Sequence, residues 1–212
     1  MGMSTVGARL NALLKEAGLE PVDSETTGRF EVYYSLFVRW NKRLNLSSIR
    51  DELGILSLHF VESIVVARHL PRGITSLLDL GSGAGLPGIP IALCRPEIAV
   101  TLAESQGKKA AFLQEAVRAL GTRVEVVAGR AEALTRTFDC VALRAVNKMS
   151  KAVAEAVELV EPSGWIALMT TAAELEQLKA AAGAQIEWVE RVQLPASESR
   201  ILALGRRANS RA

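Results

Sequence analysis

Apolar residues in the first third of the chain recur at the spacing of amphipathic helices. The segment Leu10–Ala17 has one apolar face, and Gly18 is placed to end that helix. A second apolar stripe consists of Phe30, Tyr33, Phe37, Trp40 and Leu44. Residues 51–70 carry a third helical pattern. Together these patterns predict an N-terminal helical cap over residues 1–72, with most of the aromatic side chains in its core.

From about residue 76 onward, short apolar runs alternate with helical segments. The runs that we expect to be strands are Ser76–Leu80, Ala99–Glu104, Val124–Ala128, Asp139–Arg144 and Trp165–Thr170. The helices expected between and after them are Pro87–Cys94, Lys108–Leu120, Lys148–Val160 and Thr171–Ala182. Such alternation predicts βαβ units and a doubly wound parallel sheet, here as a second domain over residues 73–212.

The end of the chain adds two further strands, Ile186–Leu194 and Arg200–Arg206, separated by the short segment Pro195–Ser199. So short a connection permits only antiparallel pairing, because a parallel pair needs a crossover of about a dozen residues. An antiparallel final strand is unlike the usual dinucleotide-binding sheet and is typical of class I methyltransferases. We therefore expect an α/β class I methyltransferase fold, Rossmann-like and mostly parallel, with an antiparallel C-terminal strand.

Composition excludes several classes of function. The longest apolar runs are far too short to cross a bilayer, and the N-terminus lacks the apolar segment of a signal peptide, so we expect a cytoplasmic protein with no membrane partner. The 2 Cys and 2 His lack the spacing of a metal or redox site, so no metal is expected. The net charge of +2 does not by itself indicate a nucleic acid.

The stretch "LLDLGSGAGLPGIPIAL" fits two overlapping glycine motifs. Gly83, Gly85 and Gly88 match the dinucleotide pattern G-x-G-x-x-G, which is a weak signal alone. Gly81, Gly83 and Gly85 match G-x-G-x-G behind an acidic strand end, Asp79. S-adenosylmethionine has no phosphate for the helix N-terminus, and its positive sulfonium favours a nearby acid. Asp79 and the C-terminal hairpin therefore favour a methyl donor over a nicotinamide cofactor.

Further candidate residues lie at the ends of the next three strands. Glu104 is placed to bind ribose hydroxyls, which both cofactors contain. Ala131 and Glu132 follow the third strand and could contact the adenine edge, although Glu132 could equally be an acid at a helix N-terminus. Arg144 ends the fourth strand, at the edge of the sheet where ligands bind in this architecture.

These residues belong to a set of motifs that closely resembles one family. "WNKRLNLSSIRD", "HFVES", "TLAESQGKKAAFL", "GRAE" and "LRAV", together with the glycine stretch, resemble the motifs of the RsmG family, also called GidB. That family methylates N7 of a guanine in 16S ribosomal RNA with S-adenosylmethionine, leaving S-adenosylhomocysteine. The resemblance implies that the cofactor positions fall on Gly81, Leu86, Ala131, Glu132 and Arg144.

The chain departs from that family's pattern at two places. The family usually has Asp-Ser where this chain has Glu62 and Ser63. It also tends to carry Lys-Gly after the fifth strand, where this chain has "LMTTAAELE" and no basic residue before Lys179. The second departure concerns contacts to RNA rather than the cofactor site.

The chemistry implied by the resemblance requires no general base, because N7 of a neutral guanine has a free lone pair. The protein has to hold N7 about 3 Å from the methyl carbon, in line with the C–S bond. We expect Arg144 to position substrate or cofactor through hydrogen bonds. We expect the substrate to be 16S ribosomal RNA or the small subunit, with an unstacked or loop guanine as the target base. Basic residues are expected to contact this RNA: Arg43, Lys108, Lys109 and Lys148.

Other interpretations remain open from the sequence. A class I methyltransferase could act on another RNA, on a protein or on a small molecule. An NAD-dependent oxidoreductase is a further alternative. We expect a monomer with no DNA partner.

Overall fold

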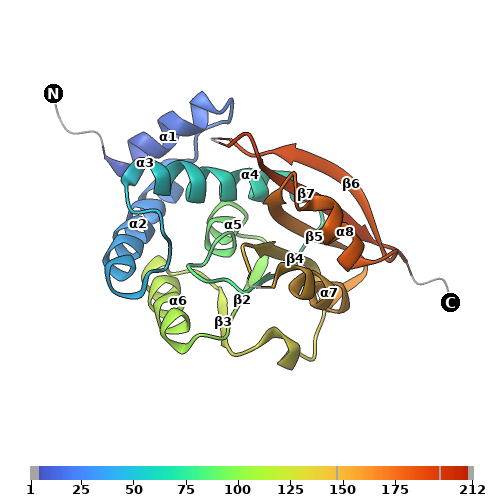
Figure 1. The fold of residues 1–212 in the computed structure, drawn as a ribbon. Helices are drawn as coiled ribbons and strands as arrows, with labels where there is room; N and C mark the ends of the chain where they lie inside the picture. The colour runs from blue at the N-terminus through green and yellow to red at the C-terminus, as the bar shows by residue number, and fades with distance from the viewer. Residues whose placement is uncertain (1–4, 147, 196, 210–212) are drawn as a thin grey trace.

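A seven-stranded sheet forms the centre of the protein in a computed structural model, which describes residues 5–146, 148–195 and 197–209 (Figure 1). The strand order is β3-β2-β1-β4-β5-β7-β6. The strands are β1 Ser76–Leu80, β2 Ala99–Glu104, β3 Glu125–Ala128, β4 Phe138–Arg144, β5 Val160–Thr171, β6 Ile186–Gln193 and β7 Arg200–Arg207. β7 is antiparallel to both of its neighbours, whereas the pairs from β3 to β5 are parallel. The predicted class I methyltransferase topology is confirmed.

Helices cover both faces of this sheet and extend beyond it at the N-terminal side (Figure 1). The N-terminal helices are α1 Val6–Glu16, α2 Ser24–Leu44, α3 Glu52–Gly54, the π-helix η1 Ile55–Val61 and α4 Glu62–His69. The others are α5 Gly88–Cys94, α6 Gly107–Leu120, the 3-10 turn η2 Ala131–Ala133, α7 Met149–Leu159 and α8 Leu175–Ala182. Within the described residues, no helix is both long and apolar enough to cross a membrane.

Two hydrophobic clusters lie on opposite faces of the sheet, and successive strand residues alternate between them. In β4, Cys140 and Ala142 belong to the cluster under α2, α4, α5 and α6, while Val141 and Leu143 belong to the cluster under α7 and α8. The same alternation applies to β1 and β7. It directs the side chain of Arg144, the last residue of β4, toward the face that α4 covers.

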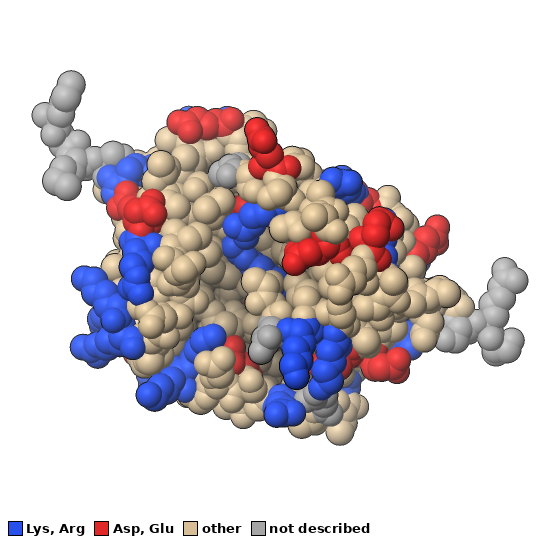
Figure 2. Space-filling model, in the orientation of Figure 1, with Lys and Arg blue, Asp and Glu red and all other residues tan. Residues whose placement is uncertain are grey.

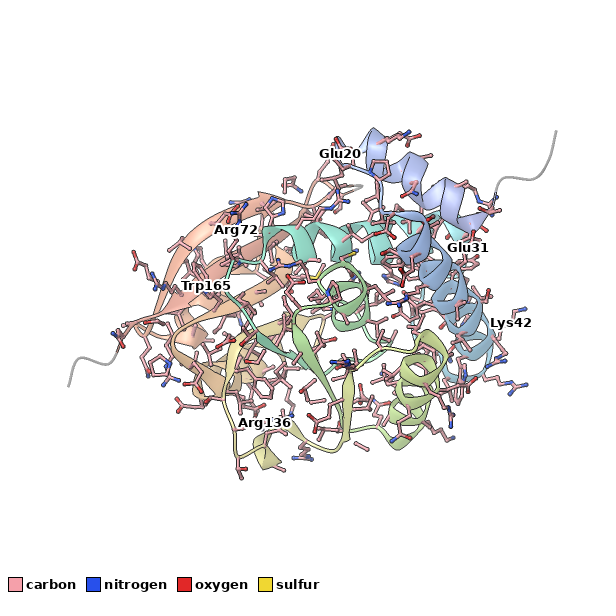
Figure 3. The ribbon with its side chains drawn as sticks, turned by 180° about the vertical axis from the view of Figure 1, so that it is seen from behind. Glu20, Glu31, Lys42, Arg72, Arg136 and Trp165 are labelled. Carbon is pink, nitrogen blue, oxygen red and sulfur yellow. The ribbon has the colours of Figure 1, made fainter. Side chains whose placement is uncertain are left out.

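The N-terminal helices share the first of these clusters with the sheet. Tyr33 and Phe60 are fully buried in it, and so is Leu77 of β1. At the surface, Glu115 of α6 accepts a hydrogen bond from the indole of Trp40 at 3.0 Å and pairs with Arg39. The view from behind shows α2 along the outer side of the molecule, with Glu31 and Lys42 on it (Figure 3).

Two expected helices differ from the structure. The segment expected as one helix over residues 51–70 is helical, but its middle, Ile55–Val61, is a π-helix. The helix expected from Thr171 begins only at Leu175. The chain stays in β5 through Thr171, which pairs with Arg200, and the carboxylate of Glu174 accepts a hydrogen bond from the Thr171 hydroxyl at 2.8 Å. Pairing with the hairpin therefore prevails over helix propensity here.

Candidate functional site

The loop between β1 and α5 has the backbone conformation that its glycines suggest. Gly81, Gly83 and Gly85 have φ values of 73°, 56° and 83°, a region that side chains disfavour. Gly88 is the first residue of α5 and does not share this conformation. The three glycines with positive φ are those of the G-x-G-x-G motif. The backbone conformation therefore supports that motif over the dinucleotide pattern G-x-G-x-x-G.

Gly88 is needed for a different reason, which is the close approach of α5 to the sheet. A Cβ at this position would lie 2.4 Å from Leu102 Cδ2 and 2.6 Å from Asp79 Oδ2. The Gly88 N–H donates to Asp79 Oδ2 at 2.9 Å. This hydrogen bond joins the first residue of α5 to Asp79 of β1.

Asp79 itself is almost entirely enclosed, with 1% of its surface exposed. Burial raises the pKa of this carboxyl to about 7, although the hydrogen bond from Gly88 acts against the shift. Its Oδ1 is buried and has no hydrogen-bond partner among the described residues. The structure thus places the acid directly under the glycine loop, with one oxygen bonded to Gly88 and the other buried without a partner among the described residues.

Glu104 holds the same loop from the neighbouring strand. Its Oε2 accepts a hydrogen bond from Gly83 N–H at 2.9 Å, and its Oε1 accepts one from Gln106 N–H at 2.7 Å. An ionised carboxylate accepts about four hydrogen bonds, so these two contacts leave capacity for ribose hydroxyls. The backbone N–H groups of Gly83 and Gln106 therefore orient this carboxylate.

Tyr33 of α2 binds the loop from the helical side, a contact that no sequence pattern predicted. Its hydroxyl donates to the carbonyl oxygen of Ala84 at 2.6 Å, across 51 positions of sequence. The ring stacks on Phe60 with the centroids 5.1 Å apart and the planes at 8°. Nothing in the aromatic stripe of α2 distinguishes Tyr33 from a core residue, so no sequence signal could have found this contact.

A cavity of ≈ 320 Å³ opens beside the loop. It lies at the carboxyl ends of β1, β2 and β3, and its walls include Gly81, Ala103, Ala131, Val146 and Lys148. Its size is that of a small-ligand site. Ligands of doubly wound sheets bind at this edge, and the cavity brings together three of the predicted residues.

The other predicted residues occupy different places. Leu86 is buried with 8% exposed and packs in the first hydrophobic cluster. The backbone of Glu132 lies in η2, whereas its side chain lies outside the described part of the structure. Lys108 is exposed and Lys109 half-buried at the start of α6, and Arg43 is exposed in the last turn of α2.

The surface that faces the viewer in Figure 2 is hollowed near its middle. Lys and Arg side chains gather on the side where Figure 1 shows α2 and α6, and again below α7. Acidic side chains gather toward α8 and the C-terminal hairpin. The charge is therefore distributed unevenly around the hollow, although the whole chain carries only +2.

Arg144 does not extend into solvent but is held by the π-helix segment. Its Nη2 donates to the carbonyl of Leu58 at 2.6 Å and lies 3.0 Å from His59 Nδ1, and Nη1 lies 3.5 Å from Ser63 Oγ. Burial lowers the pKa of Arg144 to about 10, so the guanidinium stays charged at neutral pH. A guanidinium has five N–H donors, more than these contacts require.

The histidine beside it is neutral. Burial, with the charge of Arg144 as a second cause, lowers the pKa of His59 to about 3. Because arginine only donates, His59 Nδ1 accepts from Arg144, and Nε2 carries the proton and donates to Ser47 Oγ at 2.7 Å. His59 therefore orients Arg144.

These features fit S-adenosylmethionine. The left-handed glycines, the cavity at the strand ends and the buried unpartnered oxygen of Asp79 suit an adenosine compound that carries a positive sulfonium. No cluster of three or more His, Cys, Asp or Glu residues suited to a metal ion exists in the described part of the chain.

Comparisons with known proteins identify the family. The model of GidB, rRNA small subunit methyltransferase G, matches residues 27–203. The chain belongs to this family. Ribosomal RNA small subunit methyltransferase G of Neisseria meningitidis serogroup B is 36% identical over 204 residues, covering 94% of this chain and 98% of the relative. This GidB-family chain is therefore a methyltransferase, which removes the oxidoreductase alternative.

Solved structures support the same fold for this GidB-family chain. A methyltransferase from Pyrococcus furiosus has a TM-score of 0.61 at 13% identity, covering 86% of this chain and 99% of that one. P. horikoshii TYW2 in complex with MeSAdo has a TM-score of 0.59 at 14% identity, covering 72% of this chain and 63% of that one. At such identities the likeness shows the class I methyltransferase fold alone.

Tyr33→Phe tests whether the helical cap stabilises the glycine loop. The variant leaves the buried Ala84 carbonyl without its donor, so we expect a loss of about 1–3 kcal/mol in the free energy of unfolding and weaker binding of S-adenosylhomocysteine. Denaturant unfolding and a binding titration measure the two effects. Tyr34→Phe is the matched control, because the Tyr34 hydroxyl makes only a 3.5 Å contact with Glu52. Equal behaviour of the two variants would contradict the role of Tyr33.

Asp79→Asn tests the raised pKa of the buried acid. The pKa of Asp79 rises from 3.8 to about 7 in the folded protein, so its stabilising contribution is present below pH 3.8 and is lost as the pH rises through 7. The free energy of unfolding of the variant should therefore gain on that of the wild type between about pH 4 and 7. Asp139→Asn is the control, since hydrogen bonds from Thr75 and Ser76 hold the pKa of Asp139 low. A difference that does not change with pH would show Asp79 to be ionised throughout.

Proposed function

We propose that this chain transfers the methyl group of S-adenosylmethionine to N7 of a guanine in 16S ribosomal RNA. The observation that carries the proposal is the match of the rRNA small subunit methyltransferase G model over residues 27–203. That range contains the glycine loop, the cavity and Arg144, and it extends into the antiparallel hairpin. S-adenosylmethionine supplies an electrophilic methyl group on a positive sulfonium when bound.

The residues of the site bind and orient, and none of them has to remove a proton. Gly81 and Gly85 let the backbone approach the cofactor, and Glu104 is oriented to accept from its ribose hydroxyls. Asp79, under the loop, favours the positive end of the ligand. In this proposal Glu132 and the backbone of Ala131 contact the adenine, and Leu86 supports the loop.

The proposed reaction requires no general base. Guanine N7 attacks with its own lone pair, so the rate depends on holding the base in line with the methyl group. His59, neutral and hydrogen-bonded on both nitrogens, serves to orient Arg144. We propose that Arg144 uses its remaining N–H donors to position the substrate base or the cofactor.

Basic side chains around the site are proposed to bind the RNA backbone. Lys148 lies in the wall of the cavity, at the start of α7. Lys108 and Lys109 lie at the start of α6, and Arg43 lies at the end of α2, on the side where Figure 2 shows Lys and Arg together. Phosphate neutralisation of this kind makes binding strongly dependent on salt.

The proposal also includes the oligomeric state of the protein, its compartment and its partners. We propose a monomer that acts in the cytoplasm, where ribosomal RNA is made and assembled, with neither DNA nor a membrane as partner. Residues 1–72 act as a helical cap that supports the domain of residues 73–212. Another RNA, a protein or a small molecule as methyl acceptor is the alternative, which the next experiment separates.

Labelled methyl transfer tests the proposed acceptor. Small ribosomal subunits and naked 16S RNA from a strain that lacks this protein are incubated with the enzyme and methyl-labelled S-adenosylmethionine, and the modified base is mapped. We expect label at N7 of one guanine. Subunits from the parent strain are the control and should accept no label, because the position is already methylated. Binding of S-adenosylhomocysteine without transfer to either RNA would overturn the acceptor but not the cofactor.

Lys148→Gln tests the proposed phosphate contact at the cavity. We expect the KM for RNA to rise while the affinity for S-adenosylhomocysteine changes little, and the slope of log K against log salt to fall by about one. Lys15→Gln, on the exposed end of α1, is the matched control. Unchanged KM and salt slope in Lys148→Gln would remove this residue from the RNA-binding surface.

A further inference from the structure

Three charged side chains from distant parts of the sequence meet behind the candidate site. They are Glu62, the first residue of α4, Arg144, the last residue of β4, and Arg200, the first residue of β7. Glu62 Oε2 lies 2.8 Å from Arg200 Nη2 and 3.5 Å from Arg144 Nη2. One carboxylate thus joins the helical cap, the centre of the sheet and the C-terminal hairpin.

Burial makes this arrangement costly. The Glu62 side chain is 0% exposed, that of Arg144 is 7% exposed and that of Arg200 is 27% exposed. Glu62 Oε1 has no hydrogen-bond partner in the described part of the chain. A buried ion pair gains little net stability over a well-packed apolar group of the same volume, because each ion loses its hydration. Stability alone is therefore a weak reason for these three residues to be here.

The contacts of Arg144 show what Glu62 can do. The carbonyl of Leu58, the ring of His59, the hydroxyl of Ser63 and the carboxylate of Glu62 all come from residues 58–63, at the junction of the π-helix and α4. π-helical segments are rare and often occur at functional sites. Among these four partners only Glu62 has an acidic group that can oppose the charge of Arg144, since His59 is neutral.

We propose that Glu62 is a positioning residue for the methyl-transfer reaction, acting through Arg144, and that Arg200 is its charge partner from the hairpin. Neither residue has to touch cofactor or RNA. Glu62 holds the guanidinium of Arg144 in one orientation at the edge of the sheet, and Arg200 holds Glu62 in turn. This inference rests on the proposed function in so far as it assigns Arg144 a contact with cofactor or substrate.

Glu62→Gln keeps the shape of the side chain and removes its charge. Arg144→Gln identifies the quantity that Arg144 controls, either the Kd for S-adenosylhomocysteine or kcat/KM for RNA. We expect Glu62→Gln to worsen that same quantity roughly tenfold or more, because small misplacements of a positioning group have effects of this size. Glu16→Gln, exposed at the end of α1, is the matched control and should change neither.

A double-mutant cycle separates positioning from a general structural role. If Glu62 acts through Arg144, adding Glu62→Gln to Arg144→Gln causes no further loss in that quantity, whereas independent effects would add. Full additivity, or a Glu62→Gln variant with wild-type Kd and kcat/KM at a temperature where it is folded, would overturn the inference. Thermal unfolding of each variant sets that temperature.

A second variant covers the case in which Glu62→Gln does not fold. Glu62→Asp keeps the charge but withdraws it by one methylene, and it should worsen the same quantity by less. A loss in this variant as large as that in Arg144→Gln would count against positioning by the acidic group of Glu62. The titration with S-adenosylhomocysteine uses no RNA, so the Kd values stay interpretable even if the proposed methyl acceptor is wrong. If the wild-type protein binds S-adenosylhomocysteine but methylates no RNA, only the proposed acceptor is refuted.

Discussion

Buried hydrogen bonds between the N-terminal helices and the ends of β1 and β4 hold the candidate site in place. Tyr33 of α2 binds the carbonyl of Ala84 in the glycine loop, and Leu58 of the π-helix binds the guanidinium of Arg144. Buried polar groups are costly unless they are paired, so each contact fixes both of its partners. The helical segment thereby becomes part of the site rather than a separate layer.

The alternation of side chains in the parallel sheet decides which groups these helices can reach. β1 and β4 send Asp79 and Arg144 to the face covered by α4 and α5, and β7 sends Arg200 to the same face. Three charged side chains consequently lie under one layer of helices. A shift of one residue in any of these strands would turn its charged side chain toward α7 and α8.

The charge of the buried acids in the site depends closely on what lies near them. Asp79 and Glu62 are buried carboxyls whose pKa values are raised to about 7, while the nearby His59 is neutral. Such groups respond strongly to a charge brought near them, because little water screens the interaction. A positive sulfonium beside Asp79 would favour its ionised form, so that cofactor binding and the charge of the site are coupled.

Local patterns in the sequence predict the succession of strands and helices along the chain, the antiparallel end of the sheet, the glycine motif and the residues at the strand ends. These follow from local rules, namely the period of apolar residues, the length of a connection and the backbone freedom of glycine. What those residues touch depends on how the chain packs: Tyr33 donates to Ala84, Asp79 accepts from Gly88, and Glu62 lies between Arg144 and Arg200. The π-helix and the late start of α8 were also beyond the sequence. Such contacts join segments up to about 140 residues apart, and depend on register and burial, which no local pattern in one sequence records.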